Sequence, residues 1–153
     1  MITEASPILN LLLAKGIGTK TLSDIVDSLK RHGLSPQEAG IDALGNELGW
    51  RADLKINALA VQEQADALAE QLERQNVRIL VRGFDRYPHR LDRVLGKDAP
   101  PVLFAQGNLS LLNTKAVGFC GSRHASDKGI HVAAEAARQL GANGVNVVSG
   151  YAK

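Results

Sequence analysis

Apolar residues follow a helical period up to about residue 75 and an alternating or continuous period after it. In the first part they recur every three or four positions, with proline or hydroxyl residues at segment starts and glycines at segment ends. This pattern predicts four helices, which begin at Ser6, at Thr19 or Thr21, at Ser35, and after Trp50, the last being a single long helix to about Gln75.

The second part has short apolar runs separated by turn residues, which is typical of strands. Strands are predicted at 77–81, 102–105, 115–120 and 145–148, with a short helix at 91–95 and a longer one at 127–142. We expect the four strands to form one small sheet. The prediction is therefore an α/β protein with two domains, residues 1–75 and residues 76–153.

The first domain is predicted to be helical, of the SAM or helix-hairpin-helix kind. The second is predicted to be an incomplete Rossmann-like domain with a parallel sheet, because strand, small-residue turn, helix, strand and small-residue turn follow one another from Val117 to Gly150. Both turns then lie at the carboxyl ends of parallel strands, where such sheets bind ligands.

The turn at Gly121, Ser122 and Arg123 is a candidate phosphate site. Glycine lets the backbone approach a ligand closely, serine offers a hydroxyl, and arginine supplies a planar donor fork. The helix that follows presents its positive dipole end. Three residues of the second turn are expected at the same crevice: Ser149, Gly150 and Lys153. The alternative is an ordinary turn whose arginine points into solvent.

A second candidate contact is the turn between the first two helices. Gly16 and Gly18 flank an isoleucine, and Lys15 and Lys20 stand on either side. Such a turn presents backbone N–H groups and a helix start to a nucleic-acid phosphate. The alternative is a tight connection packed on Ile17.

Charge is unevenly distributed along the chain. The net charge is +2, yet residues 74–97 hold seven basic and two acidic residues and so carry +5. This segment is either a band that faces nucleic acid or a set of scattered surface arginines. Arg86 within it, and Lys128 beyond it, are candidate auxiliary contacts. Tyr87, Phe84 and Phe104 are potential stacking groups, although core packing is favoured for the phenylalanines.

Nothing in the sequence indicates catalysis or a bound cofactor. The histidines lack a metal-ligand spacing, no nucleophile elbow surrounds Ser122, and the single cysteine, Cys120, is expected to be buried in a strand. We therefore predict no enzyme activity, no metal and no cofactor. No secretory signal or membrane-length apolar run is present, which predicts a cytoplasmic protein with no membrane partner.

With these residues identified, the chain resembles the DprA/Smf family of DNA-processing proteins. The similarity runs in family order through the helical hairpin at 13–22, residues 31–38, 85–91, 98–107, the turn at 117–123 and the end at 147–153. The last two segments together are the most specific.

The resemblance implies a protein that binds single-stranded DNA and loads the RecA recombinase onto incoming strands in natural transformation and recombination. It also implies a homodimer that acts without catalysis. Arg123 stands at the position of the family's DNA-binding arginine, and Gly121, Ser122, Ser149 and Gly150 are carried over with it.

Family members continue beyond the second turn, so the resemblance implies that this chain is the amino-terminal part of a longer protein. Much of the dimer and recombinase surface is then expected after Lys153. Two alternatives stay open. One is a nucleotide-binding enzyme of the related phosphoribohydrolase-like branch, although its glycine-rich motif is missing; the other is an interaction module whose helical domain binds another protein.

Overall fold

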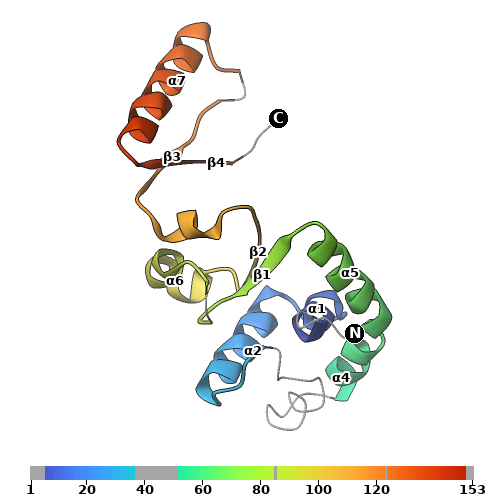
Figure 1. Cartoon of the computed structure of the whole chain (residues 1–153). Coiled ribbons are helices and arrows are strands. Elements are labelled where there is room, and N and C mark those ends of the chain that lie inside the picture. The colour runs from blue at the N-terminus through green and yellow to red at the C-terminus, as the bar shows by residue number, and fades with distance from the viewer. Residues whose placement is uncertain (1–5, 37–51, 85, 123, 151–153) are drawn as a thin grey trace. The chain divides into compact units, whose positions relative to one another are not determined.

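The computed structural model describes residues 6–36, 52–84, 86–122 and 124–150 and contains both helices and strands (Figure 1). The chain divides into two compact units, Met1–Leu109 and Ser110–Lys153. The first unit thus includes the helices together with the first two strands. A domain boundary near residue 76 stays a prediction, since compactness alone does not define a domain.

Four described helices build the core of the first unit: α1 (Ser6–Leu13), α2 (Thr19–Arg31), α4 (Ala52–Leu59) and α5 (Gln62–Arg74). α1 packs against α4 and α5, and its Leu9 and Leu11 are fully buried. Two small residues of α5, Ala65 and Ala69, are also buried. Burial of a leucine side chain contributes about 1.5–3 kcal/mol, so this apolar cluster is the main stabilising element of the unit.

The helix predicted after Trp50 is two helices, so that prediction is wrong. The chain leaves α4 at Ala60 and enters α5 after Val61, which has no side-chain cap. At the break, Gln62 accepts a hydrogen bond of 2.6 Å from the buried Asn10 of α1. Val61 packs partly buried against the core. The break thus allows both Val61 and Gln62 to contact the core. The spacing of apolar residues in the sequence does not predict this break. The helix predicted from Ser35 lies mostly outside the described residues.

A β-hairpin-like pair completes the first unit. β1 (Val77–Val81) and β2 (Val102–Gln106) are antiparallel, with Val77 opposite Gln106 and Val81 opposite Val102. The connection contains α6 (His89–Leu95) and the short helix η1 (Gly96–Asp98). Val81 belongs to the helical core, and Ile79 and Val102 pack against it. The two strands therefore pair with each other and bury one face on helices.

The second unit contains a parallel strand–helix–strand arrangement. β3 (Ala116–Phe119) and β4 (Asn146–Ser149) are joined by α7 (Asp127–Ala142) and pair in parallel, with Phe119 opposite Ser149. The Ser126 hydroxyl caps α7 by accepting from the Gly129 N–H at 3.2 Å. The predicted strands and helix of this segment are confirmed. A single sheet of all four strands is not found, because β1 and β2 form their own sheet among the described residues.

Candidate nucleic-acid interface

The two predicted phosphate turns meet at one edge of the parallel pair. Because Phe119 pairs with Ser149, the residues that follow β3 and the residues that end β4 leave the sheet at the same edge. Gly121, Ser122, Ser149 and Gly150 are all exposed there. A Cβ atom built on either glycine would meet nothing within 4 Å, so each glycine backbone is open to an approaching ligand.

Two serines shape the loop between β3 and α7. The hydroxyl oxygen of Ser122 accepts a hydrogen bond of 3.1 Å from the His124 N–H, and Ser126 caps the helix. Lys128 is exposed in the first turn of α7. The loop therefore leads into a helix start that carries Lys128 next to Asp127, and contact of this helix end with phosphate stays a prediction. Arg123 and Lys153 lie outside the described residues, and their roles stay predictions.

The turn between α1 and α2 is a compact connection. Gly16 has φ of +91°, a conformation that favours glycine, and Ile17 is buried with the Ile17 N–H donating to the Ala14 carbonyl at 3.2 Å. Lys15, Lys20 and Gly18 are exposed. Packing on Ile17 is thus present, while contact of the flanking lysines with DNA stays a prediction.

The basic segment 74–97 is not one continuous charged band, because Arg82 is buried. Only 4% of Arg82 is exposed, and its guanidinium donates to the Asp27 carboxylate of α2 at 2.5 Å. Arg82 therefore has a structural role. Six other basic residues of the segment are exposed on the first unit: Arg74, Arg78, Arg86, Arg90, Arg93 and Lys97. Arg86 adopts φ of +71°, which is unusual for a residue with a side chain.

The aromatic side chains are distributed differently from the prediction. Tyr87 is 2% exposed and its hydroxyl donates to the Pro100 carbonyl at 2.7 Å, so its ring is not available for stacking on bases. Burial, followed by the charge of Asp92, raises the pKa of Tyr87. Phe84 packs against the core as expected. Phe104 is 51% exposed, although it lies opposite Ile79, which packs on the helical core.

Cys120 is exposed directly after β3, so its predicted burial is wrong. The strand is short, and no residue of α7 is buried against it. Within the described ranges, His, Cys, Asp and Glu side chains form no group of three that is suited to a metal ion. No helix among these residues has the length and apolar character needed to cross a membrane.

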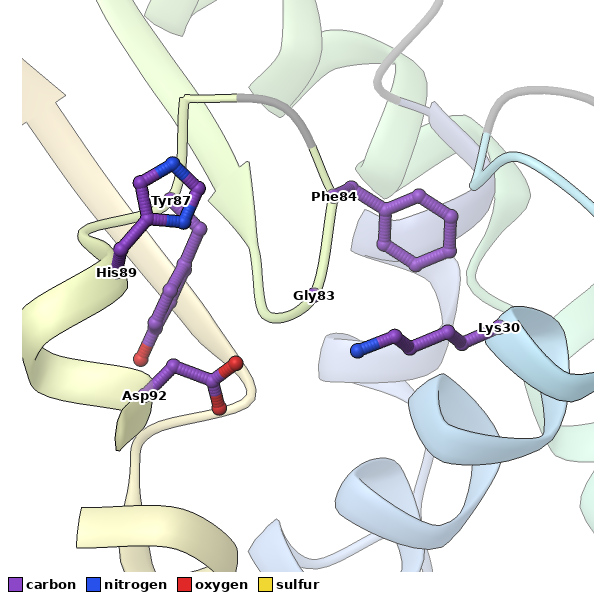
Figure 2. Close-up of a pocket in the computed structure, with 6 residues that line it drawn as sticks. All are labelled: Lys30, Gly83, Phe84, Tyr87, His89 and Asp92. Carbon is purple, nitrogen blue, oxygen red and sulfur yellow. The ribbon is translucent and has the colours of Figure 1, made fainter. Parts of the chain in front are cut away.

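Sequence reasoning missed a pocket in the first unit. It has a volume of about 260 Å³ and lies between the last turn of α2, the segment after β1, and α6 (Figure 2). Its lining residues come from three separate segments: Lys30, Gly83, Phe84, Tyr87, His89 and Asp92. No local motif announces it, because Lys30 and Asp92 each resemble ordinary surface charges in the sequence.

A parallel strand–helix–strand unit is typical of α/β proteins, which bind ligands at the carboxyl ends of such strands. Residues 78–153 match the family of DNA recombination-mediator protein A. The match begins within β1 and includes both turns and the pocket segment around α6. This match confirms the resemblance to the DprA family over residues 78–153 and indicates a role in DNA recombination or processing. Comparison with curated proteins gives no match.

Proposed function

We propose that the protein binds single-stranded DNA by holding strand phosphates in the turns after β3 and β4. The observation that carries this proposal is the pairing of Phe119 with Ser149, which brings both turns to one edge of the parallel strands. Unpaired DNA presents its phosphates along an accessible backbone. Sequence-independent contacts to phosphate are therefore the simplest way for such an edge to bind it.

The chemistry of the edge fits a phosphate group. Gly121 and Gly150 leave their backbone open, and the start of α7 carries the partial positive charge of a helix amino terminus. Lys128 contributes a positive charge in the first helical turn, next to the negative charge of Asp127. Arg123 supplies the planar donor fork in this proposal, and Lys153 and the exposed lysines at 15 and 20 are auxiliary contacts.

Membership in a family of recombination mediators supports a further step. We propose that the bound strand is transferred to the RecA recombinase, that two copies of the chain act together, and that the protein breaks no bond of the DNA. On this proposal, activity is measured as faster nucleation of RecA on a strand. No nucleotide or DNA product is expected to form.

The proposal is tested by replacing Arg123. Affinity for a fluorescent oligothymidylate is measured by anisotropy at several salt concentrations, with the full chain. Loss of one charge-assisted phosphate contact is expected to weaken binding about tenfold. It should also reduce the slope of log affinity against log salt by about 0.7, the value for one phosphate contact on a single strand.

Arg138→Ala is the matched control. Arg138 lies in the same unit and pairs with Glu135 at 2.6 Å on the exposed surface of α7. Its replacement removes the same charge as the replacement of Arg123. Its replacement should leave both affinity and salt slope unchanged. Equal behaviour of the two variants would overturn the assignment of Arg123. Release of ribose phosphate from a nucleoside monophosphate would instead support the phosphoribohydrolase-like alternative.

A further inference from the structure

The pocket of the first unit combines opposite charges with aromatic rings. Lys30 comes from the last turn of α2, and Asp92 comes from α6. Figure 2 shows the ammonium group of Lys30 and the carboxylate of Asp92 both directed into the space between these helices. Neither side chain has an ion pair or a side-chain hydrogen bond with another described residue. Both charged groups are therefore available to a ligand within the described structure.

The lysine side chain lies beside the turn at Gly83. Gly83 has φ of +77°, and a Cβ built on it would lie 3.0 Å from Cδ and 3.2 Å from Nζ of Lys30. The lysine side chain thus lies directly against the Gly83 backbone. Lys30 is exposed, and its ammonium group lies at the pocket beside this turn.

Aromatic rings line two sides of the same space. Phe84 is half-buried and packs on the helical core, and Tyr87 is buried and held by its hydrogen bond to the Pro100 carbonyl. Figure 2 shows Phe84 beside Lys30, and Tyr87 beside Asp92. Because Tyr87 is buried, Phe84 is the ring that can contact a flat ligand, and its packing on the core lowers the side-chain entropy that such a contact costs.

We propose that this pocket binds a guanine base of single-stranded DNA; the inference rests on the proposed function. Guanine carries two neighbouring donors, N1–H and the N2 amino group, which match the two oxygens of the Asp92 carboxylate. Its O6 acceptor next to them matches the Lys30 ammonium. Phe84 contributes apolar contact to the ring. The unpaired base presents this edge freely, as in other recognition of single strands.

The other bases match the pair of charges less well. Thymine has one donor, N3–H, flanked by two carbonyl oxygens. The carboxylate of Asp92 would accept from N3–H but would be repelled by a neighbouring carbonyl oxygen. Adenine and cytosine each offer one amino donor next to a ring acceptor, so one carboxylate oxygen is left facing an acceptor. The pocket is therefore expected to discriminate by hydrogen bonding and charge, while the phosphate turns bind every sequence.

The test uses the full chain and oligothymidylates that differ in one central nucleotide. Anisotropy is measured with thymine, guanine, inosine or an abasic site at that position. Guanine is expected to improve affinity about tenfold over thymine, the range of a good two-point base contact. Inosine lacks the N2 amino group, so it should lose most of this gain. Asp92→Asn and Lys30→Gln should abolish the guanine preference and leave affinity for plain oligothymidylate within about twofold.

Asp24→Asn serves as the control, since Asp24 is an exposed acid of α2 outside the pocket. It should retain the guanine preference, and thermal unfolding of each variant reports whether the fold is kept. Equal affinity for all central nucleotides, with intact binding of oligothymidylate, would overturn the guanine site alone. Absence of any binding to oligothymidylate would overturn the proposed function itself.

Discussion

The guanidinium of Arg82 lies 2.5 Å from the carboxylate of Asp27 and joins the end of β1 to the middle of α2. The same guanidinium approaches the Ser23 carbonyl at 3.5 Å and the Gly96 and Lys97 carbonyls at 3.4 Å. A buried arginine requires such partners, because an unpaired charge away from water is costly. The pair therefore attaches the strand pair and the α6 segment to the helical core.

Replacing Asp27 with asparagine is expected to destabilise the first unit by about 1–3 kcal/mol. The change keeps the shape of the side chain but leaves the buried guanidinium without its counter-charge. Because Asp27 is itself 46% exposed, water compensates part of the loss, and the largest penalties known for buried pairs are not expected. Urea unfolding at neutral pH measures the change. Asp24→Asn on the same helix should cost little, and an equal cost for both variants would contradict the role of the ion pair.

Gly83 and Gly107 allow the effect of backbone strain to be separated from the effect of a close contact. Both have positive φ, +77° and +95°, but a Cβ meets Lys30 at Gly83 and only open space at Gly107. Gly107→Ala is expected to cost about 1 kcal/mol through strain alone. Gly83→Ala should cost at least as much, and it should also displace Lys30 and weaken the guanine preference. Unfolding and anisotropy are measured together, and a retained preference in Gly83→Ala would show that the turn does not position the lysine.

Local pattern was sufficient to predict the second unit in most of its detail. The α7 segment combines helical spacing of apolar residues with Ser126 as a cap, and the apolar runs on either side are too short for helices. Parallel pairing follows, since a helical crossover of this length joins parallel strands. The edge where Gly121 and Ser149 lie was predictable for the same reason.

Long-range contacts explain where the predictions failed. Arg82 looks like its exposed neighbours in the sequence, and only the distant Asp27 determines that it is buried. The break before Gln62 depends on a partner in α1, and the antiparallel pairing of β1 with β2 on the helices depends on how the intervening segment folds. The pocket joins Lys30 with Asp92 across 62 positions of sequence, so no periodicity or motif contains it.

The hydrogen bond between Asn10 and Gln62 is expected to contribute to the packing of α1 on α5. Asn10 is 2% exposed and donates through Nδ2 at 2.6 Å, while its Oδ1 has no hydrogen-bond partner among the described residues. Gln62→Ala removes the acceptor and leaves a second buried polar group unsatisfied, at an expected cost of about 1–3 kcal/mol. Gln64→Ala, an exposed position of the same helix, is the matched control. Equal unfolding free energies for the two variants would contradict this contribution.

Alkaline pH is expected to destabilise the protein through Tyr87. Burial and the nearby Asp92 charge raise the pKa of this phenol above the ordinary value of 10.0, and the positive charge of Arg82 opposes them in part. The folded state therefore keeps the Tyr87 proton at a pH where the unfolded chain has released it. Because the unfolded state then binds fewer protons, the free energy of unfolding falls as pH rises from about 10 through the folded pKa.

Tyr87→Phe isolates this effect, although it also removes the hydrogen bond to Pro100 and should cost about 1 kcal/mol at neutral pH. Urea unfolding of both proteins across the alkaline range is the measurement. The variant is expected to lose stability less steeply above about pH 10, so that the two unfolding curves converge. Asp92→Asn should lie between them, since it removes the second cause of the raised pKa and leaves burial in place. Parallel loss of stability in the parent protein and in Tyr87→Phe would show that another group controls the alkaline transition.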